Sequence, residues 1–321
     1  MGWYIIRRLC STVVLLGAVT ALTFVLISLA PGDAALTLAG SAGGDPAYLK
    51  ALRHSLGIDR PLYQQVLHYV SAVFRGDLGF SVIQGRPVLT AITGRLPATL
   101  VLAGTSLIVA SLGGILLGMA AAARRGSRLD GTISVGIVVA YSLPVFWVGQ
   151  LLVALFAVRL HWLPTGGMTT VGMALSGPAH LADIGRHLIL PAGALSVILL
   201  GLVVRTTRVS VMEALGEDWV RAARGRGLSE CRVLFGHVLP NALRPVVTVV
   251  TGNLALVLTG TLLIETVFSW PGLGRLVLDS VLARDSQMLV GILLFSALAV
   301  SLANLLADLA YAALDPRVRP G

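Results

Sequence analysis

The stretch EALGEDWVRAARGRGLSECRVLFGHVLPNALRP, which runs from Glu213 to Pro245, lies between two strongly apolar regions in the second half of the chain. It is dense in arginine: Arg221, Arg224, Arg226, Arg232 and Arg244. Its second part, 228–239, carries five apolar residues at helical spacing that would share one face: Leu228, Cys231, Leu234, Phe235 and Val238. A first helical piece is expected over 217–224. The stretch therefore predicts a helical hairpin at a membrane surface, with a polar face left for a partner.

Four residues set the expected limits of these two helices. Gly225 and Gly227 indicate a turn between them, because glycine adopts backbone angles that other residues avoid. Ser229 is a candidate N-cap of the second helix. Pro240 is expected to end or kink it.

The small residues of this hairpin resemble the EAA loop of binding-protein-dependent ABC importer permeases. Matching positions are Ala222, Ala223, Gly227, Leu239 and Pro240, whereas Arg221 replaces the family's Glu and His237 its Ile. In that family the loop forms a helix that docks into a groove of a cytoplasmic ATPase. The resemblance implies these ATPase-coupling residues: Arg221, Ala222, Ala223, Gly227, Leu228, Leu234, Phe235, Val238, Leu239 and Pro240. A basic helix lying on anionic lipid is the alternative.

The composition is that of a polytopic membrane protein. Of the 321 residues, 56% are hydrophobic and 12% are charged, against roughly 25% charged in soluble domains. The net charge of +9 comes from arginine, since Lys50 is the only lysine. In such a chain positive charge indicates topology rather than nucleic-acid binding. Cys10 and Cys231 lie far apart in the sequence, which argues against a disulfide framework or a zinc site.

Hydropathy predicts an all-α integral membrane protein with six transmembrane helices. The first is an uncleaved span within 1–30, from Leu9 to Ala30, with Arg7 and Arg8 before it on the inner side. The other five are expected at 98–123, 132–158, 187–212, 245–268 and 287–314. Pro144 predicts a kink in the third of these six helices. With both termini inside, more than half of the 24 basic residues become cytoplasmic, as the positive-inside rule requires.

Residues 31–97 contain no stretch able to span a membrane, and we expect a mostly helical extracytoplasmic insert with helices over 45–56 and 61–74. The phrases LRHSLGIDRPLYQQ, GDLGFS and RLPATLVLA resemble one branch of the permease family, the dipeptide, oligopeptide and nickel permeases. In that branch they belong to the subunit with a large first periplasmic insert. The predicted organisation is 1–30, the insert 31–97, a core 98–314 that includes 213–245, and a cytoplasmic tail 315–321.

Motifs for catalysis are absent from the sequence. It has no Walker A pattern, no G-x-S-x-G, no H-E-x-x-H and no mid-span pair of carboxylates, so no catalytic residue is expected. His161, His180 and His187 have no ligand spacing, so no metal site is expected. Three polar residues in or near predicted spans are candidates for a translocation path: Gln150, Asn253 and Glu265. Glu265 could equally lie at the membrane interface.

The resemblance implies a type I ABC importer permease fold and the role of a permease subunit in a bacterial cell membrane. Its substrates would be dipeptides, oligopeptides or similar solutes delivered by an extracytoplasmic binding protein. The implied partners are a second homologous permease and two ATPase subunits, which would hold the ATP and Mg; this chain would carry no cofactor and bind no nucleic acid. Import of nickel or a complexed solute such as haem is the alternative. A secondary transporter would need internal repeats and mid-span ionisable residues, neither of which is convincing here.

Overall fold

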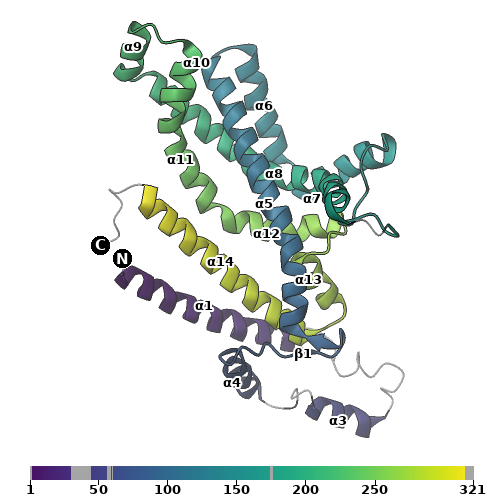
Figure 1. Cartoon of the computed structure of the whole chain (residues 1–321). Coiled ribbons are helices and arrows are strands. Elements are labelled where there is room, and N and C mark those ends of the chain that lie inside the picture. The colour runs from purple at the N-terminus through teal and green to yellow at the C-terminus, as the bar shows by residue number, and fades with distance from the viewer. Residues whose placement is uncertain (1, 30–44, 56–58, 60, 174–175, 315–321) are drawn as a thin grey trace. The chain divides into compact units, whose positions relative to one another are not determined.

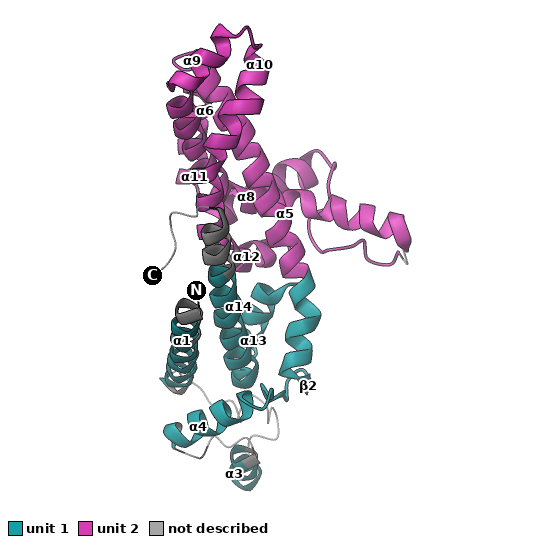
Figure 2. Cartoon of the chain, turned by 60° about the vertical axis from the view of Figure 1, so that its left-hand side comes forward, with its two compact units in different colours: residues 1–97, 271–305, 320–321 teal, residues 98–270, 306–319 magenta. Residues whose placement is uncertain are grey.

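The computed structural model describes residues 2–29, 45–55, 59, 61–173 and 176–314, and most of these residues are helical (Figure 1). The chain divides into two compact units (Figure 2). Unit 1 comprises residues 1–97, 271–305 and 320–321, and unit 2 comprises 98–270 and 306–319. Part of the predicted insert, 31–44, and the predicted tail, 315–321, lie outside the described residues.

Unit 1 contains the first predicted span and both helices predicted for the insert. These are α1 (Gly2–Leu29), α3 (Pro46–Ser55) and α4 (Leu62–Val73). The inner face of α4 packs on α1, where the buried Tyr69 ring meets Phe24 edge to face with centroids 5.6 Å apart. The apolar face predicted for the second insert helix is therefore the face that packs on α1.

A two-stranded hairpin precedes the second long helix and was not predicted. Strand β1 (Phe80–Ser81) pairs antiparallel with β2 (Arg86–Pro87). Each strand has two residues, which is too short to show the alternation by which strands are recognised. The hairpin is tied to the last helix, α14 (Ser286–Leu314), because Ser81 Oγ donates to the carboxylate of Asp285, which also accepts the Met288 amide at 3.1 Å.

Helix α5 (Val88–Ala123) begins well before the predicted start at Ala98. Its first turns are amphipathic rather than uniformly apolar: Val88 and Ile92 are fully buried, while Thr93 is exposed. They pack in unit 1 against α14 and α13 (Leu273–Leu282). Hydropathy selects only the apolar remainder of the helix and therefore places the start of the helix ten residues late; that residues 88–97 belong to an extracytoplasmic insert stays a prediction.

The third predicted span is broken rather than kinked. Helix α6 (Arg128–Ser142) ends at Leu143, and α7 (Val145–Leu152) follows with a π-helical continuation, η2 (Val153–Arg159). The two halves meet at 105°. Leu143 is extended, with φ −92° and ψ 136°, because the ring of a following proline disfavours helical angles at the preceding residue. The expected kink is therefore a sharp bend between two separate helices.

The fourth and fifth predicted spans are longer and more interrupted than expected. Helix α8 (Gly177–Leu215) starts before His187. The fifth span consists of α11 (Leu239–Gly252) and α12 (Leu254–Val267), which are separated at Asn253. Among the described residues, five helical segments are long and apolar enough to cross a membrane, and the bent α6–α7 pair makes six if it is one span. The described part of the chain therefore has the mostly helical, multi-span fold expected from its hydropathy.

Unit 2 depends on a close approach between α5 and α8. A Cβ atom on Gly118 would lie 2.7 Å from both Thr207 Cβ and the Val204 carbonyl oxygen. Both partners belong to α8, and a backbone oxygen cannot move aside as a flexible side-chain end can. Gly118 therefore serves close helix packing, as small residues do inside membranes.

Gly118→Ala is expected to destabilise unit 2 by about 1–2 kcal/mol, because overpacking against a fixed backbone oxygen, at about 2–3 kcal/mol in the upper half of the usual range, outweighs the gain of about 1 kcal/mol in helix propensity. The measurement is the apparent melting temperature of the purified protein in detergent. Gly104→Ala is the matched control, since it lies on the same helix and its Cβ would meet nothing within 4 Å. Equal melting temperatures for the two variants would contradict the close-packing role.

Candidate functional site

The arginine-rich segment, residues 213–245, forms the predicted helical hairpin at one end of unit 2 (Figure 1). Its first helix is α9 (Asp218–Gly225), and its second begins with α10 (Glu230–Val233). Gly227 lies between them with φ +80°, the left-handed region that glycine enters without steric cost. The predicted turn is thus confirmed. It is the backbone angle that requires glycine, since a Cβ at this position would meet nothing within 4 Å.

The second helix does not stop at Pro240. It passes from α10 through a π-helical turn, η3 (Leu234–Val238), directly into α11, and Pro240 lies in the first turn of α11. In this continuous helix Pro240 donates no backbone hydrogen bond, and the regular α-helical pattern is interrupted by the π-helical turn directly before it. The expected end of the helix at Pro240 was wrong, whereas a kink there stays a prediction. Ser229 occupies the N-cap position as predicted, but its side chain makes no capping hydrogen bond.

One side of the hairpin packs into the body of unit 2. Val220, Val233 and Val238 are fully buried, and Ala223 is 7% exposed. They share one apolar cluster with the C-terminal ends of the two long helices, through Met119 and Ala122 of α5 and through Val211 and Ala214 of α8. The hairpin is therefore part of the core of this unit rather than a loose connection.

The other side of the hairpin leaves apolar groups uncovered. Phe235 is 52% exposed and Trp219 38%, and Cys231 and Ala222 are also exposed. The predicted apolar face is therefore divided: Val238 is buried, Leu228 and Leu234 are half-buried, and Cys231 and Phe235 face outward. The π-helical turn shifts the register of the helix, since its bonds span five residues. For this reason Val233 and Val238 share the inner face, and the 3.6-residue spacing missed Val233.

Charged groups brace the exposed side of the hairpin. Arg224 links α9 to α10 through a bidentate pair with Glu230, with Nε to Oε1 at 2.8 Å and Nη2 to Oε2 at 3.1 Å. This hydrogen bonding raises the pKa of Arg224 above its ordinary value. Arg221 donates weakly to the Gly216 carbonyl and lies 3.4 Å from Asp218. Because these groups are exposed, each ion pair contributes only about 0–1 kcal/mol to stability.

The remaining implied coupling positions are divided between the same two sides. Leu239 is half-buried against the apolar cluster, whereas Pro240 and Arg221 are exposed. The adjacent alanines point opposite ways, with Ala223 inward and Ala222 outward. Ala223 therefore permits close contact of α9 with the rest of the chain, and Ala222 permits close contact with a partner.

The three candidate path residues occupy dissimilar surroundings within unit 2. Gln150 is exposed on α7. Asn253 is half-buried at the break before α12, and its Nδ2 donates to the Val249 carbonyl at 2.8 Å. Glu265 is fully buried and accepts the Thr99 hydroxyl at 2.7 Å. Its side chain does not reach the surface of the described chain, and its place on a translocation path stays a prediction.

No cluster of three or more His, Cys, Asp and Glu side chains that could hold a metal occurs in the part of the chain that the structure describes. His187 is buried against its own helix, with Nδ1 2.9 Å from the Asp183 carbonyl oxygen and 3.5 Å from Asp183 Oδ1. Asp183 in turn accepts the amide and the hydroxyl of Thr170, both at 2.7 Å. These groups hold the loop before α8 to that helix.

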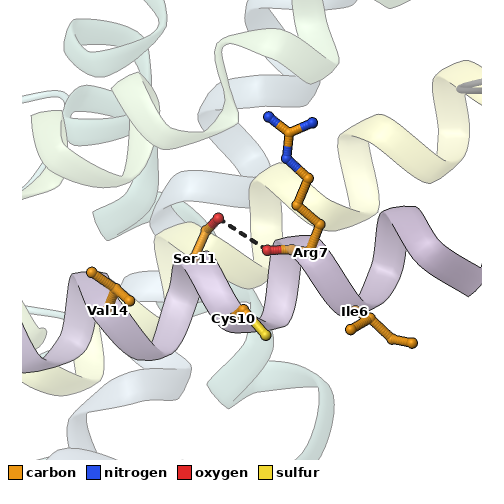
Figure 3. A pocket seen from close by; sticks show the side chains of 5 residues that line it. All are labelled: Ile6, Arg7, Cys10, Ser11 and Val14. Atoms are coloured by element: carbon orange, nitrogen blue, oxygen red, sulfur yellow. Dashed lines mark hydrogen bonds between the residues drawn. The ribbon is translucent and has the colours of Figure 1, made fainter.

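A hollow on α1 is formed by a single helix surface (Figure 3). Its lining residues are Ile6, Arg7, Cys10, Ser11 and Val14. Within this set, Ser11 Oγ donates to the Arg7 carbonyl at 3.0 Å, which is a bond inside the helix. All five residues are exposed, so the hollow is a shallow part of the surface of α1 and not an enclosed binding site.

Two features of this end of unit 2 were missed from the sequence. One is the exposed Trp219, which is followed directly by the buried Val220, so that only the fold shows which of the two faces outward. The other is an ion pair between Asp130 and Arg208, with Nε to Oδ1 at 2.7 Å. The two residues are far apart in sequence, and only their opposite charges could have suggested a pairing.

Family models cover nearly the whole chain. Residues 114–320 match the model described as "Binding-protein-dependent transport system inner membrane component". The chain belongs to this family. Residues 1–103 match the N-terminal model of the corresponding membrane component. The chain is therefore a permease subunit of an ABC importer and an integral inner-membrane protein, as its EAA-like spacing implied.

Named relatives resemble the permease over its full length. The dipeptide transport system permease protein DppB of Escherichia coli (strain K12) is 39% identical over 334 residues, covering 98% of each chain. The glutathione transport system permease protein GsiC of Escherichia coli O6:H1 is 39% identical over 319 residues, again covering 98% of each. These relatives are permease subunits, which agrees with the absence of catalytic motifs.

A solved structure shares the fold of the permease. An inward-facing MetNI methionine ABC transporter matches with a TM-score of 0.57 and 16% identity, covering 71% of the permease and 97% of that chain. The shared fold is that of type I importer permeases.

Gly227→Val is expected to weaken the permease's association with ATPase subunits several-fold, because a β-branched residue at φ +80° costs about 1–3 kcal/mol. The turn would then change its angle and displace α9. The measurement is co-purification of ATPase subunits with the tagged permease. Gly225→Ala is the control, since it has no positive φ and its Cβ would also meet nothing within 4 Å. Unchanged co-purification of Gly227→Val would contradict the role of this turn.

Proposed function

We propose that the permease forms part of the translocation path for dipeptides, oligopeptides or similar small solutes. The supporting observation is the 39% identity over 98% of both chains with a relative named for dipeptide transport. A relative of equal identity is named for glutathione transport, so both names point to solutes with peptide-like polar groups. Gln150, Asn253 and Glu265 are the polar candidates for lining the path, of which Gln150 is exposed, Asn253 half-buried and Glu265 buried in the single chain.

The proposed assembly contains this chain, a second homologous permease, two ATPase subunits and an extracytoplasmic binding protein. The exposed side of the arginine-rich segment, with Trp219, Ala222 and Phe235, would enter a groove on one ATPase. The chain itself would hydrolyse no ATP and hold no cofactor; ATP and Mg would be bound by the partner subunits. Closure of the ATPases would move the segment, and alternating access would follow from the change in the attached helices.

The substrate proposal is tested with the complete transporter in proteoliposomes, with its binding protein outside and ATP inside. Labelled dipeptides are expected to accumulate in an ATP-dependent manner. Nickel and haem are the competing substrates, because the sequence resembles the nickel permeases as well as the peptide permeases. Accumulation of nickel or haem without any peptide uptake would overturn the peptide proposal and leave the permease assignment intact.

The proposed orientation places both termini and the turn after α5 in the cytoplasm, and the insert outside. It predicts that, once the exposed native Cys10 and Cys231 are replaced by serine, Ser71→Cys on α4 reacts with an impermeant thiol reagent in intact cells. Arg125→Cys is expected to react only after the cells are opened. Ser71 and Arg125 are both exposed in the structure, so a difference in labelling would come from the membrane and not from burial in the fold. The reverse labelling pattern would contradict this orientation.

A further inference from the structure

Asp130 and Arg208 form a two-point contact near the end of unit 2 that carries the arginine-rich segment. Arg208 Nε donates to Asp130 Oδ1 at 2.7 Å, and Nη2 donates to Oδ2 at 2.9 Å. The side chain of Asp130 is 8% exposed and that of Arg208 29%. A planar guanidinium matches a carboxylate in this fork geometry and fixes both distance and angle, which a lysine could not do.

The same carboxylate also organises the turn between α5 and α6. The Gly126 amide, at φ +75°, donates to Asp130 Oδ2 at 3.0 Å. The Asp130 amide in turn donates to Ser127 Oγ at 3.3 Å, which caps α6. Asp130 therefore fastens the start of α6 to the turn before it, and through Arg208 to α8.

Helix α8 continues from Arg208 directly toward the hairpin. Val211 and Ala214, just beyond the fork, belong to the apolar cluster that holds Val220 and Val233 of the hairpin. The C-terminal end of α8 thus packs on the hairpin through Val211 and Ala214. One turn earlier, Arg208 of the same helix binds Asp130 of α6. Figure 1 shows α6 and the α9–α10 hairpin at the same end of this unit.

We propose that Asp130 and Arg208 are a positioning pair that makes α6, and with it the bent α6–α7 span, follow the arginine-rich segment when the ATPases close. The proposal rests on the proposed docking of that segment to an ATPase. Apolar contacts hold α5 to α8 and also reach α6, where Ile137 closely approaches Gly201 of α8. The fork adds a directed charged link from α8 to the start of α6. Its loss would loosen the start of α6, so that α6 would follow the hairpin less closely.

The test compares Asp130→Asn, Arg208→Lys and Arg205→Gln in the reconstituted transporter. Substrate transported per ATP hydrolysed is expected to fall about tenfold in Asp130→Asn and Arg208→Lys, within the range of coupling between sites. Arg208→Lys keeps the charge and loses only the fork, so it remains informative if Asp130→Asn fails to assemble. Arg205→Gln is the matched control: it removes an exposed arginine one turn away on the same helix and is expected to keep the wild-type ratio.

A purely structural pair would lower the amount of assembled transporter and leave substrate per ATP unchanged; that outcome would overturn the proposal. Asp130→Glu, which keeps a carboxylate, is expected to recover part of the ratio, and no recovery would also count against it. Failure of the proposed function looks different, because the wild-type protein would then show no ATP-dependent uptake of peptide.

Discussion

Trp270→Ala is expected to cost about 3–5 kcal/mol of stability, at the upper end of what truncating a buried side chain costs. Trp270 is fully buried in the main apolar cluster of unit 2. Its indole Nε1 donates to the Ala98 carbonyl at 2.8 Å, so truncation removes both the packing and a buried hydrogen bond. The measurement is the apparent melting temperature in detergent, together with the amount of protein recovered from the membrane.

Two companion variants separate the causes of this loss. Trp270→Phe keeps most of the ring and removes the indole N–H, and is expected to lose less than the alanine variant. Trp162→Ala removes the same type of side chain where it is 62% exposed, and is expected to change the melting temperature little. Equal losses for Trp162→Ala and Trp270→Ala would show that burial is not the cause.

Removing both exposed aromatic side chains from the hairpin, in the double variant Trp219→Ala with Phe235→Ala, is expected to weaken ATPase binding about a hundredfold. Phe235 is already about half-buried within the chain, so docking covers only the remainder. The expected loss is roughly 1–1.5 kcal/mol for each residue. Each residue then contributes about a factor of ten, and independent sites add. Binding of purified ATPase subunits to the reconstituted permease measures the affinity.

The matched control for the aromatic pair is Arg232→Ala, an exposed cation beside the same π-helical turn. An exposed ion pair is worth about 0–1 kcal/mol, so this variant is expected to bind almost normally at physiological salt. If Arg232→Ala loses the ATPase while the aromatic double variant retains it, docking is electrostatic, and the exposed aromatic residues would face lipid or solvent instead.

Hydropathy and spacing were sufficient for the spans, the two insert helices and the hairpin with its glycine turn. A span must satisfy its backbone hydrogen bonds internally and bury its side chains in lipid, so its signal is contained in its own residues. The requirement for glycine at position 227 is likewise local, since it comes from a single backbone angle. The order of small residues around that turn was specific enough to indicate the family.

Only the tertiary structure decided which side of each element faces what. Because the turn at 234–238 is π-helical, Val233 faces inward and Phe235 faces outward. The regular 3.6-residue period predicts neither orientation. The burial of Glu265 depends on Thr99, and the fork of Asp130 depends on Arg208; both pairs are distant in sequence. Pro144 predicted a kink, and only the structure showed a bend of 105° between two separate helices. Spans are thus determined by local composition, whereas faces, bends and polar pairs are determined by the partners that folding brings near.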